Sequence, residues 1–200
     1  MFRKSLVWIL TGIALTGIVS CGTTVSRVGT ETVTDLSGRW NDTDSRLVAE
    51  EMVKDSLNRP WVDSFLKKAG KEPTVIVGTV VNRSHEHINV QTFVNDLQRE
   101  LTNSGRVSFV AGKGEREEIR AERLEQAQNS ADETVKGPGK EIGADYMMIG
   151  TINTILDEAE GTKAVFYQVD LEMVDMANNK KVWLGQKKIK KIISKSRVKF

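Results

Sequence analysis

From residue 40 onward, hydrophobic residues recur every three or four positions in four stretches of the chain, which is the spacing of one helix face. The predicted helices span residues 47–58, 61–69, 90–101 and 115–128. Pro60 suits the first turn of the second helix, and Gly70 suits its end. The fourth helix is highly charged, with a thin apolar stripe of Ile119, Leu124 and Ala127, so we expect it to lie on the surface.

Five other stretches have the composition or the alternation of β-strands. They span residues 74–81, 106–111, 146–156, 164–174 and 182–193. The third of these is almost continuously apolar, which predicts a central strand. The fourth alternates cleanly, and we expect its odd-numbered residues, from Val165 to Met173, to share one face. The last is rich in lysine, as is common at a sheet edge.

Shorter signals place the connections between these elements. We expect a hairpin over residues 157–162, a turn over 177–180 and a short helical turn over 140–143. The resulting order is two helices, a strand, a helix, a strand, a helix and three strands. The sequence therefore predicts an α/β fold in one domain, residues 40–200, with helices packed on a single mixed β-sheet that ends in a three-stranded antiparallel meander.

The start of the chain differs from the rest, and residues 1–20 are predicted to be a lipoprotein signal peptide. Two basic residues precede a stretch without charge that runs to Ser20, which is typical of a secretory signal and short for a membrane span. The sequence from Ile18 to Cys21 resembles a bacterial lipobox, in which the peptide is cleaved before a cysteine that is lipidated. We therefore expect cleavage between Ser20 and Cys21, and lipid on Cys21.

The single cysteine of the chain supports this interpretation. It excludes an internal disulfide, and in an exported protein it would otherwise be an unpaired thiol. Two alternatives stay open: an ordinary signal peptide cleaved near a cysteine, and an uncleaved membrane anchor. Several acyl chains hold a protein stably at a bilayer, so membrane attachment would come from lipid. Gly22 after the cysteine resembles the sorting signal for the outer membrane, which implies a domain facing the periplasm.

Residues 21–39 combine the lipidated cysteine with a segment rich in threonine, serine and glycine. This segment shows neither the period of a helix nor that of a strand, and we interpret it as a flexible tether between anchor and domain. Fully extended, the residues that follow Cys21 up to residue 39 would reach roughly 60 Å.

Charge is divided unevenly along a chain that is nearly neutral as a whole. The protein has 29 lysines and arginines against 27 aspartates and glutamates, but the segment after Asp175 contains nine basic residues and no acidic one. Four of these lie on the last predicted strand: Lys187, Lys188, Lys190 and Lys191. They either guard a sheet edge or bind an acidic partner surface. Nucleic acid is a poor candidate partner for an exported lipoprotein.

No constellation in the sequence supports catalysis, and we assign no catalytic residue, cofactor or small-molecule substrate. His85 and His87 could give two ligands to a metal, but nothing nominates a third, so we predict a solvated loop and no metal site. The glycine pairs at 112 and 114 and at 137 and 139 match no phosphate-binding motif and are interpreted as turns.

An ordered set of segments resembles one known family. The set comprises Asn82–Ile88 with the helix that follows it, the strand entry Gly143–Tyr146, Val165–Glu172 and Lys181–Trp183. Together with the lipobox, these segments make the chain similar to the penicillin-binding protein activators of the LpoB family over roughly residues 35–191.

The resemblance implies an outer-membrane lipoprotein whose domain, similar to the amino-terminal domain of TolB, binds a class A penicillin-binding protein. Such a protein stimulates the glycosyltransferase and transpeptidase activities of the synthase, regulates peptidoglycan synthesis and catalyses nothing itself. The sequence departs from the enterobacterial members, which carry a long proline-rich stretch, because its tether is short and contains no proline.

Two other functions stay open. One is an assembly or secretion lipoprotein that shares the fold, such as a TolB-like or curli-secretion component, which would form rings or join an envelope export complex. The other is an envelope enzyme acting on glycan. Turnover of purified cell wall that vanishes with a single carboxylate substitution would favour the enzyme.

The lipid anchor predicts the behaviour of one variant. Cys21→Ser removes the thiol that accepts the lipid, so acylation should be abolished and the protein should stay uncleaved or become soluble. Membrane fractionation and intact mass measure the two effects. Membrane partitioning and mass unchanged from those of the wild type would refute the prediction.

Overall fold

The computed structural model describes residues 24–130, 133–136, 139 and 141–194. Ser20 and Cys21 lie outside these residues, so the cleavage and lipidation sites stay predictions. The chain divides into two units between Thr32 and Val33, and all described helices and strands belong to the second. In the first unit, residues 24–32 form one turn, closed by a 3.0 Å hydrogen bond from the Thr32 amide to the Gly29 carbonyl. None of the described helices is both long and apolar enough to cross a membrane.

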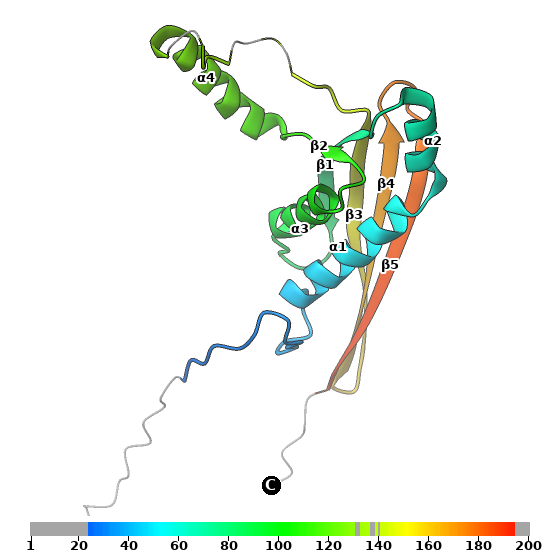
Figure 1. Ribbon diagram of the computed structural model, residues 1–200. Coiled ribbons are helices and arrows are strands. Elements are labelled where there is room, and N and C mark those ends of the chain that lie inside the picture. The colour runs from blue at the N-terminus through cyan, green and yellow to red at the C-terminus, as the bar shows by residue number, and fades with distance from the viewer. Residues whose placement is uncertain (1–23, 131–132, 137–138, 140, 195–200) are drawn as a thin grey trace, which may run out of the picture. The chain divides into compact units, whose positions relative to one another are not determined.

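Five strands form one mixed sheet in the order β2-β1-β3-β4-β5 (Figure 1). They are β1 (Thr74–Arg83), β2 (Ser108–Phe109), β3 (Tyr146–Ala159), β4 (Thr162–Asp175) and β5 (Lys181–Ser194). Strand β1 is parallel to both of its neighbours, whereas β3, β4 and β5 form an antiparallel meander. The predicted fold class is confirmed, and the strand predicted to be central is β3, which lies between β1 and β4.

Among the described residues, four helices precede the meander, at the places that the hydrophobic spacing predicts. They are α1 (Asp42–Leu57), α2 (Pro60–Ala69), α3 (Val90–Asn103) and α4 (Lys113–Asn129). A capping box starts α1: the Asn41 side chain accepts a hydrogen bond from the Asp44 amide, and the Asp44 carboxylate accepts one from the Asn41 amide, each at 3.0 Å. Gly70 ends α2 in the left-handed conformation, with φ of 66°.

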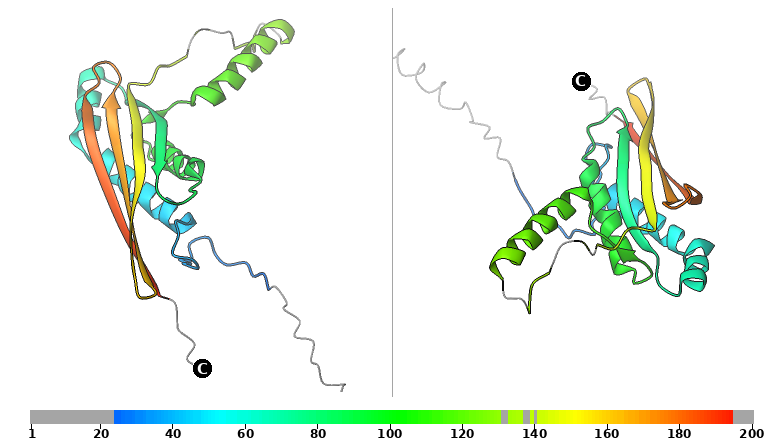
Figure 2. Two further views of the ribbon diagram at one scale, coloured as in Figure 1. Left: turned by 180° about the vertical axis from the view of Figure 1, so that it is seen from behind. Right: turned by 90° about the horizontal axis from the view of Figure 1, so that it is seen from above.

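Helices α1 and α3 pack on one face of the sheet and leave the opposite face uncovered by any described element (Figure 2). The alternation predicted for β4 is confirmed, because its odd-numbered residues from Val165 to Met173 are buried and its even-numbered ones are partly exposed. Phe93, Leu97 and Leu101 of α3 are fully buried in the core on the covered face. Helix α4 has no buried residue, as its charge predicts.

Two connections and one strand differ from expectation. The hairpin predicted over 157–162 is a turn of only two residues, because β3 and β4 pair up to Ala159 and Thr162 and leave Glu160 and Gly161 with positive φ of 49° and 81°. Strand β2 is only two residues long. Residues 141–143 form no helical turn, since so short a segment gains too few hydrogen bonds to nucleate a helix.

The one-sided core predicts a contrast between two leucines. Leu97→Ala removes a fully buried side chain of α3 and should lower the free energy of unfolding by about 2–5 kcal/mol. Leu124→Ala, at a position on α4 that is 55% exposed, is the matched control and should change it by less than about 0.5 kcal/mol. Chemical denaturation measures both values, and equal effects would contradict the assignment of the core.

Candidate functional site

The four candidate lysines of β5 divide between the two faces of the sheet. Side chains alternate along a strand, so Lys187 and Lys191 point to the face that α1 covers, and Lys188 and Lys190 point to the open face. The register agrees, because Lys191 is opposite the buried Val165, whereas Lys188 is opposite the partly exposed Gln168. The structure therefore does not present these lysines as one surface.

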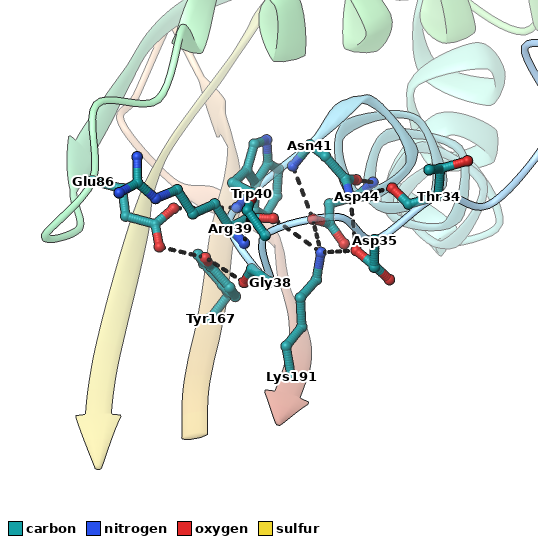
Figure 3. A network of polar contacts seen from close by, with 11 residues as sticks. Thr34, Asp35, Gly38, Arg39, Trp40, Asn41, Asp44, Glu86, Tyr167 and Lys191 are labelled. Carbon is teal, nitrogen blue, oxygen red and sulfur yellow. Dashed lines mark hydrogen bonds and ion pairs between the residues drawn. The ribbon is translucent and has the colours of Figure 1, made fainter. Parts of the chain in front are cut away.

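Lys191 is held inside a polar cluster of its own domain (Figure 3). Its ammonium group lies 2.6 Å from a carboxylate oxygen of Asp35 and 2.6 Å from one of Asp44, and it donates a 3.1 Å hydrogen bond to the Arg39 carbonyl. Only 9% of the Lys191 side chain is exposed, and the same is true of Asp44. With its three donors engaged, Lys191 is not available to a partner.

The cluster shifts the pKa values of its three charged groups. A hydrogen bond from Lys191 lowers the pKa of Asp35. Desolvation raises the pKa of Asp44 in spite of the same lysine. Desolvation also acts to lower the pKa of Lys191, but the hydrogen bonds to Asp35 and Asp44 outweigh it, and the pKa is raised.

Beside this cluster, the segment before α1 is fixed to β4 through an aromatic contact. The Trp40 ring meets those of Phe93 and Tyr167 edge-on, with centroids 6.0 and 5.7 Å away. The Tyr167 hydroxyl donates a 2.8 Å hydrogen bond to Glu86, whose other oxygen accepts one of 3.1 Å from the Trp40 amide. Desolvation, followed by the bond to Glu86, raises the pKa of Tyr167.

These contacts involve residues that sequence analysis placed in the tether. Asp35 and Arg39 contact Lys191, and the Gly38 carbonyl lies 3.4 Å from the Tyr167 hydroxyl. Residues from Val33 onward accordingly group with the second unit. The segment has no periodicity, and its few charged residues, Asp35 among them, gave no signal of which would dock.

Lys187 also has a partner within the domain, because it forms an ion pair with Glu51 of α1. Lys188 and Lys190 are different. Both are exposed, and neither forms an ion pair with any residue that the structure describes. Of the candidate basic strand, two positive charges are thus free, and both lie on the open face.

The open face is hollowed up to Gln186, which precedes Lys188 by two residues on the same face of β5. The hollow has a volume of about 850 Å³, and Met147, Ile149 and Thr151 of β3 contribute to its lining. Leu184 of β5 stands at its side and is 69% exposed. Asp170 of β4 lies within the same lining. The open face therefore combines exposed aliphatic side chains, the carboxylate of Asp170, that of Glu172, which is paired with Lys181, and two ammonium groups without a described partner. Such a mixture of apolar and charged groups is typical of a protein-binding surface.

The other candidates from the sequence give no catalytic arrangement. His85 and His87 are exposed, and the His85 ring lies 2.9 Å from the Thr154 hydroxyl. The described residues contain no group of three side chains placed to hold a metal ion. The amide of Gly112, in the first glycine pair, donates to the Glu115 carboxylate at 2.6 Å, so a side chain of the helix itself occupies that position. Residues 137 and 138 of the second pair lie outside the described residues.

The different surroundings of two lysines on one strand predict different effects on stability. Lys191→Met leaves two carboxylates without their cation and should lower the free energy of unfolding by about 2–4 kcal/mol. Lys188→Met, the matched control, should change it by less than about 0.5 kcal/mol. Urea denaturation measures both, and a loss at position 188 as large as that at position 191 would contradict the assignment of the faces.

The stability that Lys191 contributes should also depend on pH. Because the pKa of Lys191 is raised on folding, its contribution is complete below the ordinary lysine pKa of about 10.4 and is lost as the pH rises through the folded value. The difference in unfolding free energy between the wild type and Lys191→Met should therefore shrink at strongly alkaline pH. If this difference in unfolding free energy increased at strongly alkaline pH, the prediction would be contradicted.

Comparison with known proteins adds solved structures that are similar to this chain. The LpoB C-terminal domain from Salmonella enterica is 17% identical, with a TM-score of 0.34, covering 65% of this chain and 93% of that one. The corresponding domain from Escherichia coli is 15% identical, with a TM-score of 0.38, covering 70% and 97%. The NMR structure of E. coli LpoB is 14% identical, with a TM-score of 0.42, covering 88% and 84%.

The family assignment rests on a sequence comparison. No curated protein sequence matches the chain. A family model described as peptidoglycan-synthase activator LpoB matches residues 44–189, which is more than half of the 200 residues. The match runs from the first turn of α1 to Ile189 of β5 and thus includes the covered core, the hollow and Lys188. The chain therefore belongs to the LpoB family of peptidoglycan-synthase activators.

Proposed function

We propose that this protein is a non-catalytic, lipid-anchored activator of a class A penicillin-binding protein. The observation that carries the proposal is the family match over residues 44–189. The proposal extends the family assignment to one class of synthase, to attachment through Cys21 and to a place on the inner side of the outer membrane. The regulated process is peptidoglycan synthesis.

An activator of this kind needs a binding surface and no reactive group. It raises the rate of a synthase by binding the active conformation more tightly than the resting one, and its effect is limited by that difference in affinity. The open face supplies such a surface. Lys188 and Lys190 would meet acidic side chains of the synthase, whereas Lys187 and Lys191 stabilise the domain internally.

The contacts of residues 33–40 bear on how far the domain can reach. If the segment that starts at Val33 stays docked, only residues 22–32 connect the lipidated cysteine to the domain. Fully extended, these residues reach roughly 40 Å, compared with roughly 60 Å for a tether that ends at residue 39. A docked segment therefore holds the start of the domain closer to the outer membrane, and the synthase must come correspondingly closer to be reached.

The proposal predicts that the free lysines are needed for activation. The double variant Lys188→Glu with Lys190→Glu should weaken binding to the purified class A synthase about tenfold or more and reduce the stimulation of glycan polymerisation. Its binding should also depend less on salt, because attraction between exposed charges is screened. Affinity measured at two salt concentrations and a polymerisation assay test these effects.

A second double variant controls for the change in net charge. Lys67→Glu with Lys68→Glu makes the same change on exposed residues of α2 and should leave binding within about twofold of the wild type. If both double variants lost binding, the overall charge of the domain and not the position of the two lysines would determine the affinity. If the wild type neither binds the synthase nor changes its polymerisation rate, the proposed function is wrong.

A further inference from the structure

On the open face lies a carboxylate, that of Asp170, to which the described residues give no counter-ion. Asp170 accepts hydrogen bonds from three side-chain amides, one on each strand of the meander. Gln186 of β5 donates at 2.8 Å, Gln168 of β4 at 2.9 Å and Asn153 of β3 at 3.3 Å. No described lysine or arginine forms an ion pair with Asp170.

The three amides fix the position of Asp170 and leave its charge in place. Neutral donors satisfy the lone pairs of a carboxylate, but they do not neutralise it. Asp170 is partly buried against the sheet, where a charge is screened less than in open water. Gln186 is exposed, so an incoming donor can replace its amide without disturbing the other two. Asp170 is thus arranged to receive a cation.

The surroundings of Asp170 define what can bring that cation. On one side is the hollow of about 850 Å³, to which Met147 and Ile149 contribute, with the exposed Leu184 next to it. Glu172, the other acidic residue there, is already paired with Lys181. On the other side, Lys188 and Lys190 follow Gln186 along the same face of β5. Among the described residues of β4 and β5, the unpaired charges on this face are therefore one negative followed by two positive. Arg83 of β1 and Asp157 of β3 are exposed on the same face farther from the edge strand.

We propose that the open face binds a segment of the synthase that places a cationic side chain against Asp170, apolar side chains in the hollow, and acidic side chains beside Lys188 and Lys190. This inference rests on the proposed function and specifies its contact surface. The segment has one favourable direction along the sheet, because reversing it would oppose like charges. A desolvated carboxylate–cation pair beside apolar contacts is the kind of centre that dominates the affinity of many interfaces.

A second copy of this chain fits the same face less well. Each open face carries three basic side chains without a described ion pair, Arg83, Lys188 and Lys190, and two such acidic ones, Asp157 and Asp170. Two such faces would bring six positive charges against four negative ones, so two positive charges would be left unmatched at the interface. Unpaired charges that are removed from water oppose association. The charge pattern therefore favours a different protein over a second copy.

The test uses the full chain in detergent and the purified class A penicillin-binding protein of the same organism as the probe. Asp170→Asn keeps the shape of the side chain and removes its charge, and it should weaken binding by about tenfold or more. Leu184→Ala removes an exposed aliphatic side chain at the hollow and should weaken binding several-fold. The matched controls on α4, Glu117→Gln and Leu124→Ala, should bind within about twofold of the wild type.

The outcomes of these binding measurements separate failure of the inference from failure of the proposed function. If the wild type binds the synthase and both open-face variants bind it as tightly as the wild type does, the inference is overturned and the proposed function stands. If the wild type does not bind and does not alter polymerisation, the proposed function fails and the inference with it. If Asp170→Asn abolishes self-association measured by sedimentation and leaves synthase binding intact, the face binds a second copy and the inference is overturned. If Asp170→Asn does not fold, the comparison of Leu184→Ala with Leu124→Ala gives the answer.

Discussion

The structure depends on one constraint: helices cover only one face of its sheet, while side chains along each strand alternate between both faces. On β5 this alternation gives neighbouring lysines opposite roles. Lys187 and Lys191 pair with carboxylates on the covered side, and Lys188 and Lys190 stay unpaired on the other. The basic residues of this strand lie close together in the sequence, but one pair of lysines therefore stabilises the domain and the other is accessible to a partner.

The cluster around Lys191 shows how the covered face fixes the start of the domain. Its ammonium group joins Asp35, ahead of the first helix, to Asp44 in the first turn of α1, while Trp40 packs against Tyr167 of β4. Partly buried ion pairs often contribute less to stability than apolar packing would, but breaking one leaves a charge that is costly to bury. The cluster is thus best understood as a constraint that selects one docked conformation of the segment.

Much of the fold could be predicted from the sequence because local signals and burial agree. The apolar spacing that leads to Leu97 in α3 and the alternation around Tyr167 in β4 gave the right elements and the right faces. The predicted hairpin loop around Glu160 and Gly161 was too long. Residues 157–159, two of them acidic, continue the strand through backbone pairing, which composition does not reveal. The docking of Asp35 could not be predicted, because it depends on a lysine 156 residues away.

The candidate site was harder to predict than the fold. The lysines of β5 were identified, but which of them are free depends on contacts with Glu51 and Asp44, which are distant in sequence. Asp170 gave no signal, because it alternates with apolar residues like any polar position on a strand. Its role emerges only when Asn153, Gln168 and Gln186 are brought around it by three adjacent strands.

The central claim is that the face away from the helices contacts the synthase, and site-specific photo-crosslinking in cells tests it most directly. A crosslinking residue at position 184, on the open face, should give an adduct with the class A penicillin-binding protein. One at position 47, where Leu47 of α1 is 44% exposed on the helical side, should give none. An adduct from position 47 and none from position 184 would contradict the account.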